Sequence, residues 1–236
     1  MELSKLGLLE IAEHEGIVLG PYKDSVGVWT YGIGHTHSAG LPVPGTMPRE
    51  DTRRWSDVRV DEELLSIISL FDTDLGKYEE RVQKWVQTER LNQAQFDALV
   101  SFDYNTGGIY YKNKSGRYVN AHLVKAINSG DLSGDQFMGW VRPKEIIKRR
   151  KQEQALFRSG DYSANGDSIT LWDALGDGRL KVRGVISGGD LVDLMKKAKT
   201  TRILPTKKDI KTIVKTSDEE KKSRRNLFQR IFGLGD

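Results

Sequence analysis

The feature that most constrains the fold is an abrupt change of sequence pattern at Gly16. Before it, apolar residues at helical spacing predict an amphipathic helix over residues 3–13. After it, four glycines punctuate short apolar segments over residues 20–36, a pattern typical of short strands joined by tight turns. A chain that passes from a helix directly into a small sheet is expected to have an α+β fold.

Helical patterns dominate after the predicted sheet. Residues 37–60 contain Pro42, Pro44 and Pro48 and are expected to form a long surface loop. Residues 60–86 predict one long helix that bridges two lobes, and residues 92–104 predict a helix buried on most sides. Further helices are expected over 120–128, 135–140 and 144–157. The predicted architecture is a small N-terminal β-lobe and a larger helical lobe joined by the long helix.

The main domain is expected to close near Tyr162, which leaves residues 163–236 as a basic C-terminal extension of unknown role. The extension holds 16 Lys and Arg against 10 Asp and Glu, or +6; of the overall 37 and 33, this leaves 21 and 23, or −2, for residues 1–162. Its first part is rich in turn-forming residues, and residues 191–199 predict a helix.

The end of the chain, KKSRRNLFQRIFGLGD, places apolar side chains behind a cluster of Lys and Arg. A basic amphipathic segment of this kind can contact an anionic membrane or lipopolysaccharide, dock on its own domain or on a partner, or remain disordered. The residues leave these alternatives open.

Composition excludes several kinds of chemistry. The chain has no cysteine, which excludes disulfides, thiolate zinc sites and thiol nucleophiles. The four histidines, at positions 14, 35, 37 and 122, form no HExxH pair, so no metal and no cofactor are expected. No nucleic-acid partner is expected either. Catalysis would therefore depend on oxygen or imidazole groups.

Hydropathy predicts a soluble protein. Apolar residues make up 37% of the chain, charged residues 30%, and no apolar run approaches the roughly 20 residues of a membrane-spanning helix. The N-terminal segment lacks a long apolar stretch and turns acidic within ten residues, which predicts no signal peptide. Synthesis in the cytoplasm is expected.

Two carboxylates and a threonine are spaced in a way that suits chemistry on a sugar. Eight residues separate Glu15 from Asp24, and five separate Asp24 from Thr30. Glu15 would end the first helix while the other two would lie on neighbouring strands, so one cleft could hold all three side chains. Glycoside hydrolysis uses such a pair, a protonated acid on one face of the sugar and an ionised carboxylate on the other. Spacing alone is equally compatible with ordinary surface carboxylates.

The letters around this spacing resemble the phage-type lysozymes of glycoside hydrolase family 24. The family pattern of Glu, eight residues, Asp, five residues and Thr is matched, as are Tyr22 and Gly27 around the aspartate and the Gly-x-Gly-His strand at 32–35. LNQAQFDALVSFDYNTG resembles the helix at the family's core, and IKRRKQEQALFRSGDY its closing helix. The resemblance spans roughly residues 5–162. It implies a lysozyme-like fold and an enzyme of host lysis that cleaves the peptidoglycan β-1,4 bond between N-acetylmuramic acid and N-acetylglucosamine.

The resemblance also implies roles for individual residues. Glu15 would be the general acid, Asp24 the general base that orients the attacking water, and Thr30 a second partner of that water. The family is thought to invert the anomeric centre, which requires carboxyl groups about 6.5 to 9.5 Å apart. Asn105 would face the substrate or cap its helix. Arg149 would pair with Glu15, although the adjacent Arg150 admits a shift of one residue.

Other residues near the site have structural interpretations. His35 could act as a base, but the family pattern favours a hydrogen bond or salt bridge that ties the small lobe to the long helix. Gly32 and Gly34 are expected to accommodate the backbone of a twisted strand. Trp140 resembles a packed tryptophan of the family's core. Trp29 and Tyr31 alternate with Thr30 and are expected to face away from the cleft.

The chain departs from simple family members in the loop over 37–60, in the segment GGIYYKNKSGRYVNAH and in residues 163–236. The first two could edge the sugar groove, with Tyr110, Tyr111 and Tyr118 stacking on rings, or could be surface decoration. Alternatives to a lytic hydrolase are a lytic transglycosylase, a virion-associated lysozyme that contacts virion proteins through its extension, and a catalytically silent wall-binding module. Release from the host cytoplasm to the periplasm and wall is expected to need a separate membrane-pore protein.

Overall fold

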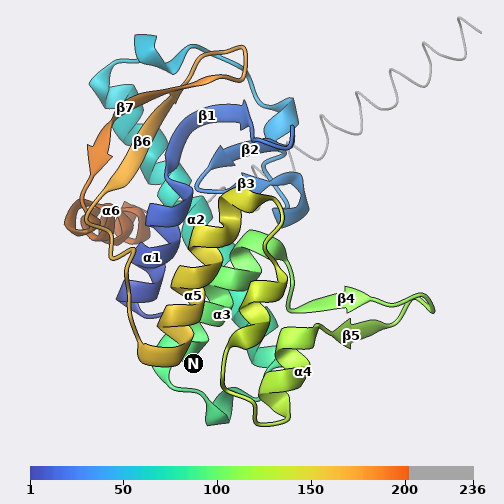
Figure 1. Ribbon diagram of the computed structural model, residues 1–236. Helices are drawn as coiled ribbons and strands as arrows, with labels where there is room; N and C mark the ends of the chain where they lie inside the picture. The colour runs from blue at the N-terminus through green and yellow to red at the C-terminus, as the bar shows by residue number, and fades with distance from the viewer. Residues whose placement is uncertain (202–236) are drawn as a thin grey trace, which may run out of the picture. The chain divides into compact units, whose positions relative to one another are not determined.

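The computed structural model describes residues 1–201, which form one compact unit. They combine one five-stranded sheet, one two-stranded sheet and six α-helices (Figure 1). The α+β class and the lysozyme-like division into a small sheet lobe and a larger helical lobe are confirmed. The predictions for the segment KKSRRNLFQRIFGLGD fall outside the described residues.

The first helix, α1 (Lys5–Glu15), begins and ends at residues suited to helix termini. The side chain of Ser4 accepts a hydrogen bond from Gly7 N at 3.0 Å and caps the N-terminus. At the other end Gly16 has φ 68°, and a Cβ at this position would lie 3.1 Å from both Thr170 O and Trp172 Nε1. A glycine is required here because the chain turns in a left-handed conformation and passes close to another strand.

The main sheet has the strand order β3-β2-β1-β6-β7. Its N-terminal part consists of β1 (Ile17–Lys23), β2 (Trp29–Gly32) and β3 (His35–Thr36). β2 pairs antiparallel with both β1 and β3. The register sets Tyr22 opposite Thr30, and Thr30 opposite Thr36. These strands occupy the region where the glycine-punctuated pattern predicted them.

The sheet continues into the segment predicted to be an extension. β6 (Ile169–Ala174) pairs parallel with β1, and β7 (Leu180–Ile186) pairs antiparallel with β6. β6 covers an edge of β1 that would otherwise present unpaired backbone groups. The β6 side chains of Ile169, Leu171 and Ala174 are buried. The predicted division after Tyr162 therefore falls within the compact unit. Turn-forming residues around both strands obscured them in the sequence.

The helical lobe is built on two long helices. α2 (Asp57–Trp85) has 29 residues and runs along the sheet lobe into the helical lobe, as the sequence predicted (Figure 1). α3 (Gln93–Thr106) is the core helix, and it packs against α1, α2 and α5 (Ile147–Ser159). Its apolar side chains are fully buried: Phe96, Ala98, Leu99, Val100 and Phe102.

Smaller elements complete the unit. α4 (His122–Asn128) lies in the helical lobe, and α6 (Gly188–Thr201) packs on α2. The predicted loop over 37–60 contains three short 3-10 helices (His37–Ala39, Pro44–Thr46, Thr52–Arg54), and further 3-10 turns span Thr88–Arg90, Asp135–Gly139 and Lys144–Ile146. The segment predicted as an insertion forms a hairpin of β4 (Tyr110–Lys112) and β5 (Tyr118–Asn120). Across residues 1–201, none of the helices has the length and apolar character needed to span a membrane.

Two carboxylates of α1, buried Glu10 and half-buried Glu13, bind the chain beyond Tyr162. Glu10 Oε2 accepts a hydrogen bond from Ala164 N at 3.0 Å, and Glu13 Oε2 accepts one from Gly166 N at 2.7 Å. Burial raises the pKa of Glu10 to about 7, and the Ala164 N–H opposes this shift only in part. Folding therefore favours the neutral form of Glu10.

We expect the stability contributed by neutral Glu10 to be lost as pH rises. Its pKa is about 7 in the folded protein and 4.5 as a free group, so this stability is complete below about pH 4.5 and disappears as pH rises through 7. Glu10→Gln keeps an acceptor for Ala164 N and does not ionise. Between about pH 5 and pH 8 its free energy of unfolding should improve by about 2 kcal/mol relative to wild type, measured by urea titration. A pH-independent difference, as expected for the exposed control Glu62→Gln, would contradict this assignment.

Candidate active site

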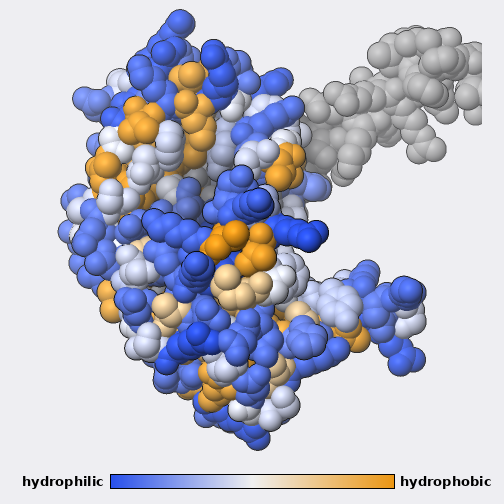
Figure 2. All heavy atoms as spheres, viewed as in Figure 1, coloured by the Kyte–Doolittle hydropathy of each residue, from blue (hydrophilic) through white to orange (hydrophobic). Residues whose placement is uncertain are grey.

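A cleft of about 450 Å³ opens between the sheet lobe and the helical lobe. Figure 2 shows the molecule hollowed on this side, above the projecting hairpin. The lining is mostly polar and comes from both lobes: Glu15, Tyr22, Asp24, Thr30, Gly34, Thr36, Ser38, Tyr78, Arg81, Tyr104, Asn105, Thr106, Gly107 and Tyr110. The three residues that the sequence predicted to be catalytic therefore share one cleft.

Glu15 enters the cleft from the last position of α1, and its side chain is only 17% exposed. A Cβ at Gly34 would lie 2.9 Å from Glu15 Oε2 and 3.1 Å from the ring of Tyr104. Gly34 also has φ 66°, a conformation that other residues rarely adopt. The glycine thus leaves the space that the carboxyl group occupies, which is a more specific role than the backbone accommodation expected from sequence.

Asp24 lies in the turn between β1 and β2. Its Oδ1 accepts hydrogen bonds from Val26 N at 3.0 Å and Val28 N at 2.8 Å, which fix the orientation of the carboxyl group. Oδ2 accepts no hydrogen bond from residues 1–201, and Asp24 lines the cleft. Gly27, with φ 84°, closes the turn. One oxygen of Asp24 is held by the protein while the other can accept a proton from water.

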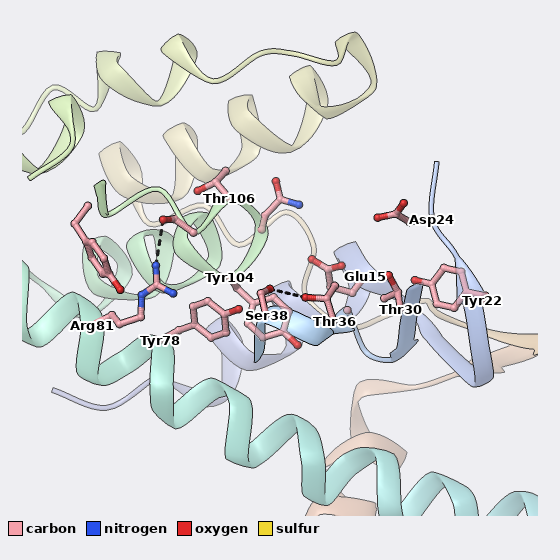
Figure 3. Close-up of a pocket in the computed structure, with 14 residues that line it drawn as sticks. Glu15, Tyr22, Asp24, Thr30, Thr36, Ser38, Tyr78, Arg81, Tyr104 and Thr106 are labelled. Atoms are coloured by element: carbon pink, nitrogen blue, oxygen red, sulfur yellow. Dashed lines mark hydrogen bonds between the residues drawn. The ribbon is translucent and has the colours of Figure 1, made fainter. Parts of the chain in front are cut away.

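Thr30 lines the same cleft as the two carboxylates. It lies opposite Tyr22 in the sheet, is buried, and its hydroxyl donates to Val28 O at 3.3 Å. Figure 3 shows Glu15, Thr30 and Asp24 directed into the same part of the cleft from different elements. Burial raises the pKa of Tyr22, and the charges of Glu15 and then Asp24 raise it further, so both carboxylates act on one tyrosine.

Arg149 pairs with Glu15, as the sequence predicted. Its Nη1 donates to Glu15 Oε1 at 2.5 Å, and its Nε donates to Glu153 Oε1 at 3.0 Å. The adjacent Arg150 is fully buried and contacts Glu153 Oε2 at 2.8 Å, and no contact joins it to Glu15. Arg149 is thus the arginine of the pair, and the shift of one residue is excluded.

Asn105 is exposed in the cleft and lies within α3, which ends at Gly107, so it does not cap the helix. Its Oδ1 accepts a hydrogen bond from Arg150 Nη2 at 2.8 Å. The amide NH₂ group is left to donate into the cleft, which suits an acceptor on a sugar or an acetamido group.

His35 ties the sheet lobe to the long helix. It is 2% exposed, its Nδ1 shares a hydrogen bond with Asp74 Oδ2 at 2.5 Å, and its Nε2 lies 2.8 Å from Pro42 O, which accepts a hydrogen bond. It does not line the cleft. Gly32 has φ 62° and packs against Ile67, as expected for a backbone role.

The three aromatic residues set aside from the site also lie away from the cleft lining. Tyr31 is buried and donates to Glu63 Oε1 at 2.6 Å. Trp29 is half-buried with Lys23 and Arg49 over its ring, so it is a surface platform and not a core residue. Trp140 packs edge-on against Phe102 but is 40% exposed, which places it at the border of the core.

Sequence reasoning missed the part of the cleft that comes from α2, where Tyr78 and Arg81 lie on one face of the helix. Of the hairpin tyrosines that could edge the groove, Tyr110 lines the cleft. The spacing of three residues between Tyr78 and Arg81 indicates a shared helix face, but nothing in the sequence identifies that face with the cleft. Glu153 was also missed, although it follows Arg149 by four residues and Arg150 by three.

The comparisons with known proteins all lead to the same family. The family model described as phage lysozyme matches residues 12–153. The endolysin of Salmonella phage P22 is 28% identical over 165 residues, covering 67% of this chain and 99% of that protein. The endolysin of Bacillus phage PZA is 29% identical over 167 residues, covering 68% of this chain and 56% of that longer protein. A solved endolysin from Escherichia coli O157:H7 phage FAHEc1 is 26% identical, with a TM-score of 0.48 over 69% of this chain and 96% of that one.

Arg149 should be far more important for stability than an arginine in an exposed pair on the same helix. Arg149→Met leaves Glu153 buried without one of its partners, and we expect a loss of about 3 kcal/mol in the free energy of unfolding. The matched control is Arg158→Met, which breaks the exposed pair with Asp135 and should cost less than about 1 kcal/mol. Urea titration of both variants measures the difference, and equal losses would show that the buried pair has no special weight.

Proposed function

Because the chain belongs to the phage lysozyme family and is thus a peptidoglycan-degrading glycoside hydrolase, we propose that it hydrolyses the β-1,4 bond between N-acetylmuramic acid and N-acetylglucosamine with inversion. The observation that carries this proposal is the shared cleft: an acid from the end of a helix and an aspartate from a strand turn enter it from different elements. An inverting reaction needs two carboxyl groups on opposite sides of the bond.

Glu15 is the general acid in this proposal. In its protonated form it donates to the glycosidic oxygen as the C1–O bond breaks, and the leaving sugar departs as an alcohol. Arg149 fixes Oε1 of the carboxyl group, while Oε2 lies beside Gly34, where the absence of a side chain leaves room for it. This arrangement orients the acid, because one oxygen is held by the arginine and the other is left to carry the proton.

Asp24 is the general base. A water between Asp24 and the sugar loses a proton to Oδ2 and attacks C1 from the face opposite to the leaving group. The two backbone N–H groups that bind Oδ1 keep the other oxygen directed outward. The Thr30 hydroxyl, which lines the same space, provides a second hydrogen bond for the water, and the Asn105 amide binds the substrate.

We further propose that the protein acts as an endolysin, made in the host cytoplasm and released to the cell wall at lysis. The endolysin relatives from phages support this role. A virion-associated role and contact of the C-terminal segment with an anionic membrane or lipopolysaccharide remain predictions.

Loss of the acid should abolish turnover without unfolding the protein. Glu15→Gln cannot donate a proton, and we expect the clearing of purified peptidoglycan to fall by about a thousandfold or more. The matched control is Glu62→Gln, an exposed residue outside the cleft, which should keep wild-type activity. Circular dichroism verifies folding, and a folded Glu15→Gln protein with more than a tenth of wild-type activity would sink the proposed mechanism.

Product analysis separates hydrolysis from transglycosylation. In ¹⁸O-water the proposed reaction places one solvent oxygen on the new reducing end, and inversion makes the α-anomer the first product seen by NMR. A lytic transglycosylase would release an anhydro product that carries no solvent oxygen. An initial β-anomer would instead indicate retention and a different role for Asp24.

A further inference from the structure

The β4–β5 hairpin projects from the helical lobe (Figure 1), and its first residue, Tyr110, lines the cleft. Its turn is well held: Asn113 Oδ1 accepts hydrogen bonds from Ser115 N at 3.1 Å and Arg117 N at 3.0 Å, and Asn113 N donates to Arg117 O at 2.9 Å. At the base of the hairpin, the backbone N of buried Ala121 donates a hydrogen bond to the carbonyl O of buried Ile109 at 3.0 Å. The hairpin is therefore a structured arm.

The arm carries a concentrated positive charge. Lys112, Lys114 and Arg117 are all exposed, and no acidic residue occurs between positions 105 and 130. None of these three side chains forms an ion pair with any residue of 1–201. Three unneutralised cations on a short hairpin produce a local field that favours an anionic ligand.

Aromatic rings connect these cations to the cleft. Arg81 lies 4.9 Å from the ring of Tyr110, Tyr110 meets Tyr118 edge-on at 5.2 Å, and Lys112 lies 5.0 Å from the ring of Tyr118. Arg81 and Tyr110 also line the cleft. This row of two rings between two cations therefore begins at the proposed active site and runs outward along the hairpin as far as Lys112.

The ring of Tyr110 is engaged by its neighbours. Trp85 stacks on it at 5.0 Å with an interplanar angle of 27°, and the Arg81 guanidinium also contacts it. Tyr110 thus anchors the hairpin to α2 and offers little free face to a sugar. Tyr111 and Tyr118 are exposed farther out on the arm, but three cations with no ion pair within residues 1–201 lie around them, so we expect charge to contribute more than ring stacking to what the arm binds.

We propose that the β4–β5 hairpin binds the carboxylates of the peptide stems carried by the glycan strand in the cleft. The proposal rests on the proposed function, because the glycan must occupy the cleft for its stems to reach the arm. Peptidoglycan is a neutral sugar chain with anionic peptide branches, and those branches leave the glycan where the lactyl groups project. A cationic arm at the mouth of the cleft distinguishes stem-bearing glycan from bare glycan.

The test compares two soluble glycans of equal length, one with stem peptides and one from which an amidase has removed them and whose freed lactyl carboxylates have been converted to neutral amides. Binding is measured by calorimetry on the full-length Glu15→Gln protein, which does not consume the ligand. Adding Lys112→Gln, Lys114→Gln and Arg117→Gln should weaken binding of the stem-bearing glycan by about fivefold or more and change binding of the bare glycan by less than twofold. The difference should shrink in high salt.

The matched control replaces two lysines and one arginine that are exposed and lie away from the cleft: Lys5→Gln, Arg90→Gln and Lys181→Gln. It has the same net charge as the hairpin variant and should bind both glycans like the parent. Equal weakening by the two triple variants, equal weakening on both glycans, or no weakening would each overturn the proposal. If wild-type protein digests peptidoglycan but the hairpin variant binds stem-bearing glycan normally, only the proposed role of the hairpin is refuted. If wild-type protein does not digest peptidoglycan, the proposed function is refuted.

Discussion

The buried guanidinium of Arg149 is the interaction on which the site depends. It holds Glu15 of α1 and Glu153 of α5, and its Nη2 donates to Ser101 O of α3 at 3.3 Å. A buried cation without such partners would be strongly unfavourable, so the three helices are held in one relative arrangement. The position of the proposed general acid is thus a property of the helical lobe, although Glu15 itself lies where the helix meets the sheet.

The sheet lobe fixes the other half of the site by different means. Asp24 and Thr30 are placed by backbone pairing and by a turn whose N–H groups bind one carboxylate oxygen. The two lobes are then joined by His35, whose two ring nitrogens bind Asp74 on α2 and the carbonyl of Pro42. The distance across the cleft therefore depends in part on buried polar contacts that join the sheet lobe to the helical lobe.

Much of this could be predicted from local sequence patterns. α1, α2, α3 and α5 have apolar spacing that is nearly independent of context, and the pairing of Arg149 with Glu15 came from the family resemblance. β6 and β7 were missed because turn-forming residues flank both strands, and because β1, the second partner of β6, is distant in sequence. The contribution of α2 to the cleft and the role of Glu153 were missed because they depend on which helix faces meet, and a single sequence does not contain that information.

The parallel pairing of β1 with β6 has a consequence for the timing of assembly. Ile17 lies beside Leu171, 154 positions later (171 − 17), so the first strand must wait for almost the whole unit to be synthesised before its outer neighbour exists. The glycine that directly follows Glu15 touches this late strand, at Thr170 and Trp172. Glu15 is synthesised well before β6, yet the end of its helix lies beside that strand. A nascent chain that has not yet formed β6 would therefore carry the carboxyl group of Glu15 without the strand that lies beside the end of its helix.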